Sequence, residues 1–227
     1  MQRFIDILLS ATALLVLSPL LIPIVILLRL TGEGEILYLQ SRVGRGGRMF
    51  KVFKFATMVK NSASIGTGTV TLKNDPRILP VGDFLRRTKI NELPQLLNII
   101  NGTMSIIGPR PQTRRCFDAF PNRSQQAIKR VRPGLSGIGS IIFRNEEDML
   151  HQDANPDKLY DEVIMPYKGL LEEWYEGHQG FVTYVMLIVL TIWVVLRSDV
   201  AIVWRVFPSL PKCDANVAAL LKIDANA

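Results

Sequence analysis

The chain has 227 residues, 48% of them hydrophobic, and a mean hydropathy of +0.21. This length suits one domain with a membrane anchor and argues against two independent domains. The composition argues against a purely water-soluble protein. The formal net charge of +7 suits anionic lipids, nucleic acid or phosphorylated small molecules, and charge alone does not choose among them. Cys116 and Cys213 match no metal or redox spacing, so we expect reduced thiols on the cytoplasmic side.

An uncharged segment near the N-terminus, residues 7–28, is long enough to cross a bilayer, which needs roughly 20 apolar residues. No small-residue cleavage site follows it, so we expect it to be retained. Arg3 precedes the segment and several basic residues follow it, so both flanks have the character of cytoplasmic flanks. Pro19 and Pro23 predict a kink near Ser18 and Pro19. The residues alone leave two interpretations equally open, a re-entrant helix and a plain transmembrane helix with a tolerated kink.

The middle of the chain predicts short strands and helices. Residues 36–39 and 49–55 have strand character and flank the turn GRGG at 44–47, which indicates a β-hairpin. Residues 61–74 are rich in Ser, Gly and Thr and predict a loop. We expect helices over 82–87, 92–100 and 124–131. With Pro94 in its first turn, the second of these would place Asn91 and Glu92 at a helix N-terminus, where phosphate is attracted.

The last part of the chain is polar and then apolar. Acidic residues between 146 and 162 predict a solvated face, and His151 and His178 have no ligand spacing around them and are expected on the surface. Residues 181–196 are uncharged but short for a span, so we expect a helix at the membrane surface. Four aromatic residues are expected to seat the domain among lipid headgroups: Trp174, Tyr175, Tyr184 and Trp193.

Three strings stand out in chain order: FKVFKFATM at 50–58, FLRRTKINELPQLLN at 84–98, and MSIIGPRPQ at 104–112. Together with Arg3, Asp6 and the proline-broken anchor at Ser18 and Pro19, they resemble the bacterial sugar transferases, the monotopic phosphoglycosyl transferases that act on polyprenyl phosphate. The resemblance runs from Arg3 to about residue 139. Its specificity comes from several uncommon strings in the family's order, since any one of them alone would be weak.

The resemblance implies an α/β fold class: a small, mostly helical cytosolic domain with a short β-hairpin, attached to a re-entrant membrane helix broken at Ser18 and Pro19. It favours re-entry over a plain span. The expected division is an anchor at 1–30, a catalytic domain at 31–180 and an interfacial apolar helix with a tail at 181–227.

The activity implied is transfer of a sugar-1-phosphate from a UDP-sugar to undecaprenyl phosphate, with release of UMP and a requirement for Mg²⁺. This would initiate glycan assembly on the cytoplasmic face of the bacterial inner membrane, with membrane lipid and downstream glycosyltransferases as further partners. Phosphoryl transfer needs cations around the moving charge. The expected substrate-binding residues are Lys54, Arg86, Thr88, Gln95, Arg110, Pro109 and Pro111, and the expected catalytic residues are Glu92 and Asn91, with Glu92 also the candidate metal ligand.

This chain departs from the family at two positions. Ala56 stands where the family often has Arg, and Asn91 stands where it usually has the Asp that carries the covalent intermediate. An amide is a very poor nucleophile toward phosphorus, although it can position phosphate or metal. Three outcomes therefore stay open: Glu92 is the nucleophile, the acceptor phosphate attacks the donor directly, or the protein is inactive.

Two rival functions follow from the sequence. Asn91 motivates a catalytically silent membrane scaffold that recruits glycosyltransferases. The net charge alone motivates a nucleic-acid binder, but the sequence has none of the helix-turn-helix, zinc or base-stacking signatures of that class, so no nucleic-acid partner is expected.

Overall fold

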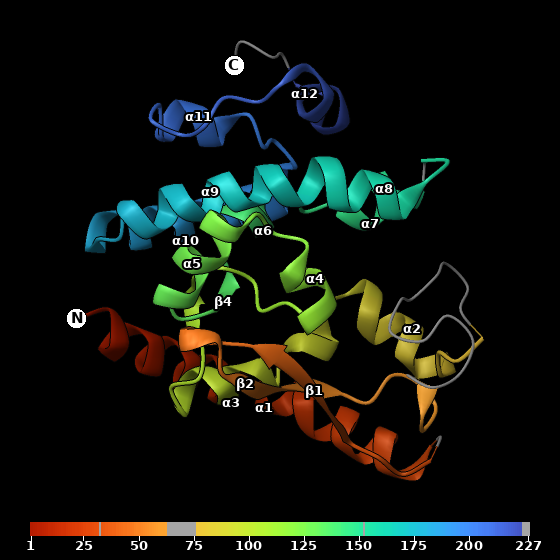
Figure 1. The fold of residues 1–227 in the computed structure, drawn as a ribbon. Coiled ribbons are helices and arrows are strands. Elements are labelled where there is room, and N and C mark those ends of the chain that lie inside the picture. Colours follow the sequence, from red (N-terminus) through yellow and green to blue (C-terminus); the bar gives the residue numbers. More distant parts are fainter. Residues whose placement is uncertain (32, 63–75, 152, 224–227) are drawn as a thin grey trace. The chain divides into compact units, whose positions relative to one another are not determined.

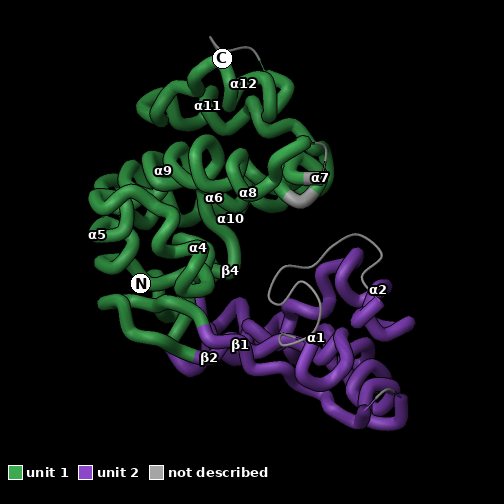
Figure 2. The backbone as a smooth tube through the Cα atoms, turned by 45° about the vertical axis from the view of Figure 1, so that its right-hand side comes forward, with its two compact units in different colours: residues 1–4, 42–50, 103–227 green, residues 5–41, 51–102 purple. Residues whose placement is uncertain are grey.

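The computed structural model describes residues 1–31, 33–62, 76–151 and 153–223 (Figure 1). The chain divides into two compact units (Figure 2). Unit 1 contains residues 1–4, 42–50 and 103–227, and unit 2 contains residues 5–41 and 51–102. These units are defined by contacts within the chain, and the expected division into anchor, catalytic domain and tail stays a prediction. Each unit is described by itself below.

Unit 2 holds most of the apolar N-terminal helix and the elements that follow it. Its elements are α1 (Gln2–Leu30), most of β1 (Leu37–Val43) and β2 (Met49–Phe55), α2 (Pro80–Arg87), the 3₁₀ turn η3 (Ile90–Glu92) and α3 (Gln95–Ile100). β1 and β2 pair in a two-stranded sheet, which confirms the predicted hairpin. The second strand has the predicted bounds, and the first extends beyond residue 39.

The helix α1 is long and apolar enough to cross a membrane by length and composition. Large apolar side chains along it are exposed, among them Leu15 at 75% and Val16 at 69%. It is a single helix through Pro19 and Pro23, and the Ser18 hydroxyl donates to the Leu15 carbonyl at 2.7 Å. The re-entrant course predicted for this helix stays a prediction.

The C-terminal half of α1 is held by an apolar cluster within unit 2. Ile24 and Leu28 of the helix are buried with Phe55 from β2 and Leu85 from α2. Burying such side chains stabilises a fold by roughly 1.5–3 kcal/mol each. The apolar helix α1 is therefore packed directly on β2 and α2.

The sequence prediction for the second helix of this region needs a correction. Glu92 and Asn91 do not open a helix that runs to Ile100. They lie in the separate 3₁₀ turn η3, and α3 begins three residues after Glu92, with Pro94 as its N-cap. Proline fixes its own φ and lacks an N–H, so it suits a helix start and cannot continue one. The predicted loop at 61–74 falls almost wholly outside the described residues.

Unit 1 is mostly helical. Its elements are η1 (Arg45–Gly47), β3 (Ser105–Ile107), α4 (Arg114–Asp118), α5 (Asn122–Arg130), β4 (Gly134–Ser136), α6 (Ile138–Ile142), α7 (Glu146–His151), α8 (Pro156–Leu159), the π-helix η4 (Tyr160–Ile164), α9 (Met165–Gly177), α10 (Phe181–Arg197), α11 (Ile202–Val206) and α12 (Ala215–Leu221). β3 and β4 pair in parallel, with Ser105 opposite Gly134. α9 packs against α5 and α6 (Figure 1).

Aromatic residues expected at lipid headgroups are instead part of the core of unit 1. Trp174, Tyr175 and Tyr184 are 8%, 5% and 1% exposed, and only Trp193 has an open ring at 44%. The buried polar groups have partners: the Trp174 indole donates to Ser209 at 3.0 Å. The sequence could not separate these roles, because an amphipathic ring suits both a membrane interface and a core with one hydrogen-bond partner.

The C-terminal residues fold onto α9. The Tyr167 hydroxyl donates to the Pro211 carbonyl at 2.7 Å, and Trp204 donates to the same carbonyl at 3.2 Å. Phe207 lies against the Trp174 ring with 5.0 Å between centroids. The segment that contains Trp204, Phe207 and Pro211 therefore packs within unit 1.

Candidate active site

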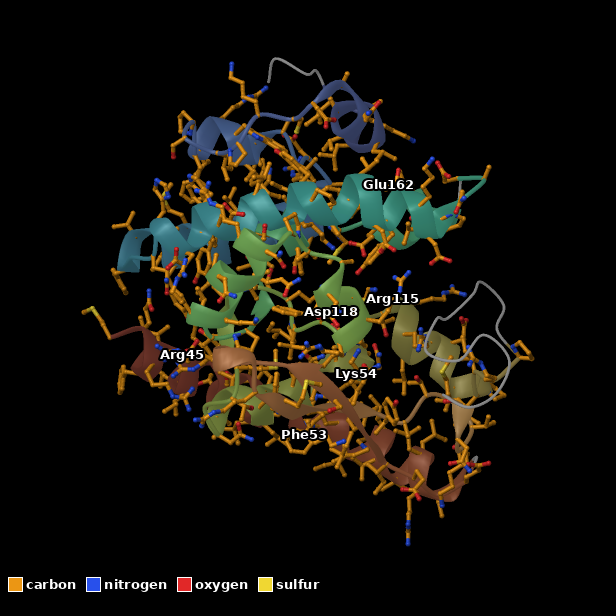
Figure 3. The ribbon with its side chains drawn as sticks, viewed as in Figure 1. Arg45, Phe53, Lys54, Arg115, Asp118 and Glu162 are labelled. Atoms are coloured by element: carbon orange, nitrogen blue, oxygen red, sulfur yellow. The ribbon has the colours of Figure 1, made fainter. Side chains whose placement is uncertain are left out.

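The candidate catalytic carboxylate lies beside a lysine from the neighbouring strand. The Nζ of Lys54 is 3.5 Å from the Oε1 of Glu92, and the two side chains are only 18% and 16% exposed. Lys54 comes from β2 and is labelled in Figure 3, and Glu92 ends η3. A pair this sheltered from water is screened less than a surface ion pair. The fold therefore joins two residues that lie 38 positions apart in the sequence, a catalytic and a phosphate-binding candidate.

Asn91 is buried next to this pair. The residue is 7% exposed, and its Oδ1 is a buried oxygen with no hydrogen-bond partner among the described residues. A buried polar atom without a partner costs about 1–3 kcal/mol, and Asn91 shares this state with oxygens elsewhere in the described chain, such as Oε2 of Glu172. The oxygen can accept a hydrogen bond or ligate a cation, and it cannot attract an anionic phosphate oxygen.

A strained backbone turn delivers these two residues. α2 ends at Arg87, and Lys89 then adopts a left-handed conformation with φ 58° and ψ 10°. Such a conformation usually falls to glycine, because a Cβ makes it unfavourable by about 1–2 kcal/mol. The turn reverses the chain so that η3 packs back against α2. Among the described residues, the same conformation also occurs at Asn61, Ser198 and Lys222.

The other candidates of unit 2 lie around that turn. Arg86 is half-buried in the last turn of α2, while Arg87 is exposed and forms an ion pair with Asp83 at 3.3 Å. The Thr88 hydroxyl donates to the Phe84 carbonyl at 2.7 Å, so this side chain caps α2. Gln95 is 2% exposed in the first turn of α3. Arg86 and Thr88 thus lie on either side of Arg87, at the end of α2 that leads to Asn91.

The sequence GPRP at residues 108–111, here called the GPRP turn, belongs to unit 1. Pro109 and Pro111 are buried, and Arg110 between them is half-buried. Gly108 donates to the Ser136 carbonyl at 2.8 Å, and Gly134 donates to the Pro109 carbonyl at 2.9 Å, which ties the turn to β4. A Cβ on Gly108 would collide with the Arg132 carbonyl oxygen. Glycine is therefore required here by close backbone approach.

Arg110 lines a small hollow of the same unit. The lining residues are Val43, Gly44, Pro109, Arg110, Pro111, Gln112, Phe117, Ile128 and Pro133. The backbone of Val43 donates to the Gln112 carbonyl at 2.9 Å, which fixes the end of β1 beside the segment after the turn. The two prolines restrict the backbone on either side of Arg110. The backbone at Arg110 would therefore lose little conformational entropy when this residue binds an anion.

A divalent cation fits the residues of unit 2 only together with other ligands. In the described ranges, no three or more His, Cys, Asp or Glu side chains gather in a possible metal cage. Mg²⁺ is usually held by one or two carboxylates together with water and substrate phosphates. Glu92 offers one carboxylate and Asn91 one buried neutral oxygen. These groups fit an ion that arrives with the phosphates of a nucleotide.

Sequence reasoning missed several buried polar residues, among them Asn98 and Glu172. Asn98 is 1% exposed on α3, and Glu172 is 4% exposed on α9. Asn98 gives a weak signal in the sequence, because it is the one polar residue in the string LLNII. Glu172 is followed by Glu173, whose side chain pairs with Arg123, and nothing in the sequence shows that Glu172 has no such partner among the described residues.

Comparisons with known proteins show the family of this chain. The family described as bacterial sugar transferase matches residues 1–198, and the chain belongs to this family. A UDP-N-acetylgalactosamine-undecaprenyl-phosphate N-acetylgalactosaminephosphotransferase of Aeromonas hydrophila is 38% identical over 143 residues, which are 62% of this chain and 34% of that protein. The UDP-glucose:undecaprenyl-phosphate glucose-1-phosphate transferase of Escherichia coli is 36% identical over 162 residues, which are 67% of this chain and 33% of that protein.

Shorter relatives are also similar. The exopolysaccharide production protein PSS of Rhizobium leguminosarum bv. phaseoli is 44% identical over 148 residues, which are 62% of this chain and 73% of that protein. The chain thus spans about a third of the Aeromonas and Escherichia proteins and most of the Rhizobium protein. Its C-terminal residues 199–227 lie beyond the family match.

Proposed function

We propose that the chain transfers a sugar-1-phosphate from a UDP-sugar to undecaprenyl phosphate. A phosphate oxygen of the acceptor ends bonded to the sugar-bearing phosphorus, the bond from that phosphorus to the bridging oxygen breaks, and UMP leaves with that oxygen. The product is a lipid diphosphate sugar, which fits an initiating step of exopolysaccharide or related glycan assembly. The single observation that carries the proposal is the sheltered Lys54–Glu92 pair beside the buried Asn91, in a chain of this family.

Each residue has a role that its environment supports. Lys54 supplies positive charge for the phosphates, and Glu92 supplies the only negative charge of the Asn91–Glu92 dyad. Arg86 in unit 2 is a candidate for binding phosphate oxygens through paired hydrogen bonds, and so is Arg110 in unit 1. Mg²⁺, when bound through Glu92 and Asn91, would supply neutralising charge on the donor phosphates. Because Asn91 is uncharged and a poor nucleophile, two routes remain. Either Glu92 attacks the sugar-bearing phosphorus of the donor, or the acceptor phosphate attacks it directly.

We further propose that α1 enters and leaves the membrane by its cytoplasmic face and that the catalytic part lies in the cytoplasm at the inner membrane. Basic residues on both flanks of α1 support this, as does the packing of Ile24 and Leu28 against the elements of the site. α10 adds an exposed apolar surface that includes Val189, Ile192 and Leu196, which suits contact with lipid.

Purified chain in lipid nanodiscs with Mg²⁺, undecaprenyl phosphate and a panel of UDP-sugars tests the activity. UMP release with at least one donor is expected, and its loss on chelation of the metal is expected. A second candidate function is an inactive scaffold for later glycosyltransferases, favoured by Asn91. Absence of UMP release with every donor, from folded protein, would support the scaffold and contradict the proposed activity.

A further inference from the structure

Asn98 makes two hydrogen bonds that link α3 to β2 within unit 2. Its Nδ2 donates to the Lys51 carbonyl at 2.8 Å, and its Oδ1 accepts from the Phe53 backbone N–H at 2.9 Å. The residue is 1% exposed, so water does not compete for these bonds. Both partners are main-chain atoms of the strand, which makes the contact independent of the side chains at 51 and 53.

The amide of Asn98 takes the place of a neighbouring strand. In a sheet, the N–H and C=O groups of alternate residues point to the same edge of a strand. Lys51 and Phe53 are alternate residues, and their groups meet one amide that offers both a donor and an acceptor. β1 is the other partner of β2 in the described sheet. The strand is thus held by β1 and by the Asn98 side chain.

This contact lies next to the candidate catalytic pair. Lys54 directly follows Phe53 on β2, and both are labelled in Figure 3. Glu92, the partner of Lys54, lies six residues before Asn98 in the segment that continues into α3. Asn98 therefore connects the segment that carries Glu92 to the strand that carries Lys54. We propose that Asn98 is a positioning residue that sets Lys54 against Glu92 for the reaction, an inference that rests on the proposed function.

Asn98→Asp is the sharpest perturbation, because it preserves size and shape. It replaces the Nδ2 donor by an oxygen, so that two acceptors face each other at the Lys51 carbonyl and a buried charge is added. Losing such a buried contact corresponds to roughly ten- to a hundred-fold in an equilibrium. Asn101→Asp is the matched control, since it makes the same chemical change at the exposed C-cap of the same helix.

Hydrogen–deuterium exchange tests the structural step without any need for activity. Peptides covering 51–55 should exchange faster in Asn98→Asp than in the wild type or in Asn101→Asp, while peptides from α9 stay unchanged. Unchanged exchange at 51–55 would overturn the proposal. The exchange measurement does not depend on activity, so it tests the role of Asn98 in positioning β2. The proposed function is tested separately, because it fails if the wild type releases no UMP.

A double-mutant cycle with Lys54→Gln tests the functional step. Turnover and the dissociation constant of the UDP-sugar, measured by calorimetry, are compared in four proteins. Asn98→Asp should lower turnover or donor affinity by about ten-fold or more in the wild-type background and have little further effect on either once Lys54 is replaced. A purely structural role would instead give equal losses in both backgrounds, and that result would overturn the proposal. Asn98→Ala, which adds no charge, should repeat the pattern of Asn98→Asp.

Discussion

The buried carboxyl of Glu172 makes the stability of this protein depend on pH in a way that one substitution should remove. The side chain lies in unit 1 on α9, one oxygen accepts from the Gly139 backbone N–H, and the other has no partner among the described residues. Burial raises the pKa of Glu172 from 4.5 to about 7, while the positive charge of Lys168 and the Gly139 hydrogen bond act in the opposite direction. Lys168 also pairs with Glu146, so it keeps a counter-ion when Glu172 is neutral.

The sign and size of the effect follow from these values. A carboxyl whose pKa is higher in the folded protein favours folding when it is protonated, so this contribution is complete below pH 4.5 and is lost as the pH rises to about 7. The difference between 4.5 and about 7, at about 1.4 kcal/mol for each pH unit, corresponds to about 3 kcal/mol. Most of that loss, about 2 to 3 kcal/mol, develops between about pH 5 and pH 8.

Glu172→Gln keeps the shape and removes the ionisation. The variant should therefore gain stability relative to the wild type between pH 5 and pH 8, with the difference in melting temperature widening by about 5 to 10 °C. Thermal unfolding in nanodiscs at the two pH values measures this. Glu162→Gln is the control, because its side chain is 64% exposed. A difference in melting temperature that stays constant with pH, or that narrows, would refute this account of Glu172.

Three further predictions concern the site and the anchor. Arg110→Ala should raise the KM for the UDP-sugar about ten- to a hundred-fold, because a charge-assisted contact is worth about 1.5–3 kcal/mol, and unchanged kinetics of folded protein would remove Arg110 from the site. Asn91→Asp should restore a carboxylate at 91, so mass spectrometry of enzyme with donor and Mg²⁺ but no acceptor should show an added sugar-phosphate; its absence would contradict a nucleophile at this position. In a protein whose native cysteines are replaced by serine, new cysteines at Gln2 and Leu30 should both resist an impermeant thiol reagent added outside intact cells. Adding Pro19→Leu should straighten α1 and make one of the two cysteines reactive. Labelling of one cysteine in the protein that keeps Pro19 would show instead that α1 crosses the membrane.

The candidate site residues could be named from the sequence because they lie in short, uncommon strings, and their roles stay predictions. Pairing of Lys54 with Glu92 was not predicted, since both were assigned from separate strings and sequence gives no distance between them. The start of α3 was misplaced because Leu93 and Leu96 continue a helical period through η3, and only the backbone shows that the chain turns at Lys89 before it reaches Pro94.

Other features had no usable signal. β3 and β4 are three residues each, too short for an alternating pattern, and their parallel pairing depends on the close approach of Gly108 and Gly134. The burial of Trp174 and Tyr184 depends on residues far away in the sequence. His178 was correctly expected at the surface, although its ring also stacks on Trp174 with 4.6 Å between centroids.

The most direct test of the central claim is formation of the lipid product from radiolabelled UDP-sugar and undecaprenyl phosphate, compared between the wild type and Glu92→Gln. The substitution keeps the size and hydrogen-bonding capacity of the side chain and removes the charge that faces Lys54 at 3.5 Å. The wild type is expected to form a labelled lipid diphosphate sugar only when both substrates are present, and folded Glu92→Gln is expected to form almost none. Equal product from both proteins would contradict the assignment of Glu92, and no product from the wild type with any donor would contradict the transferase itself.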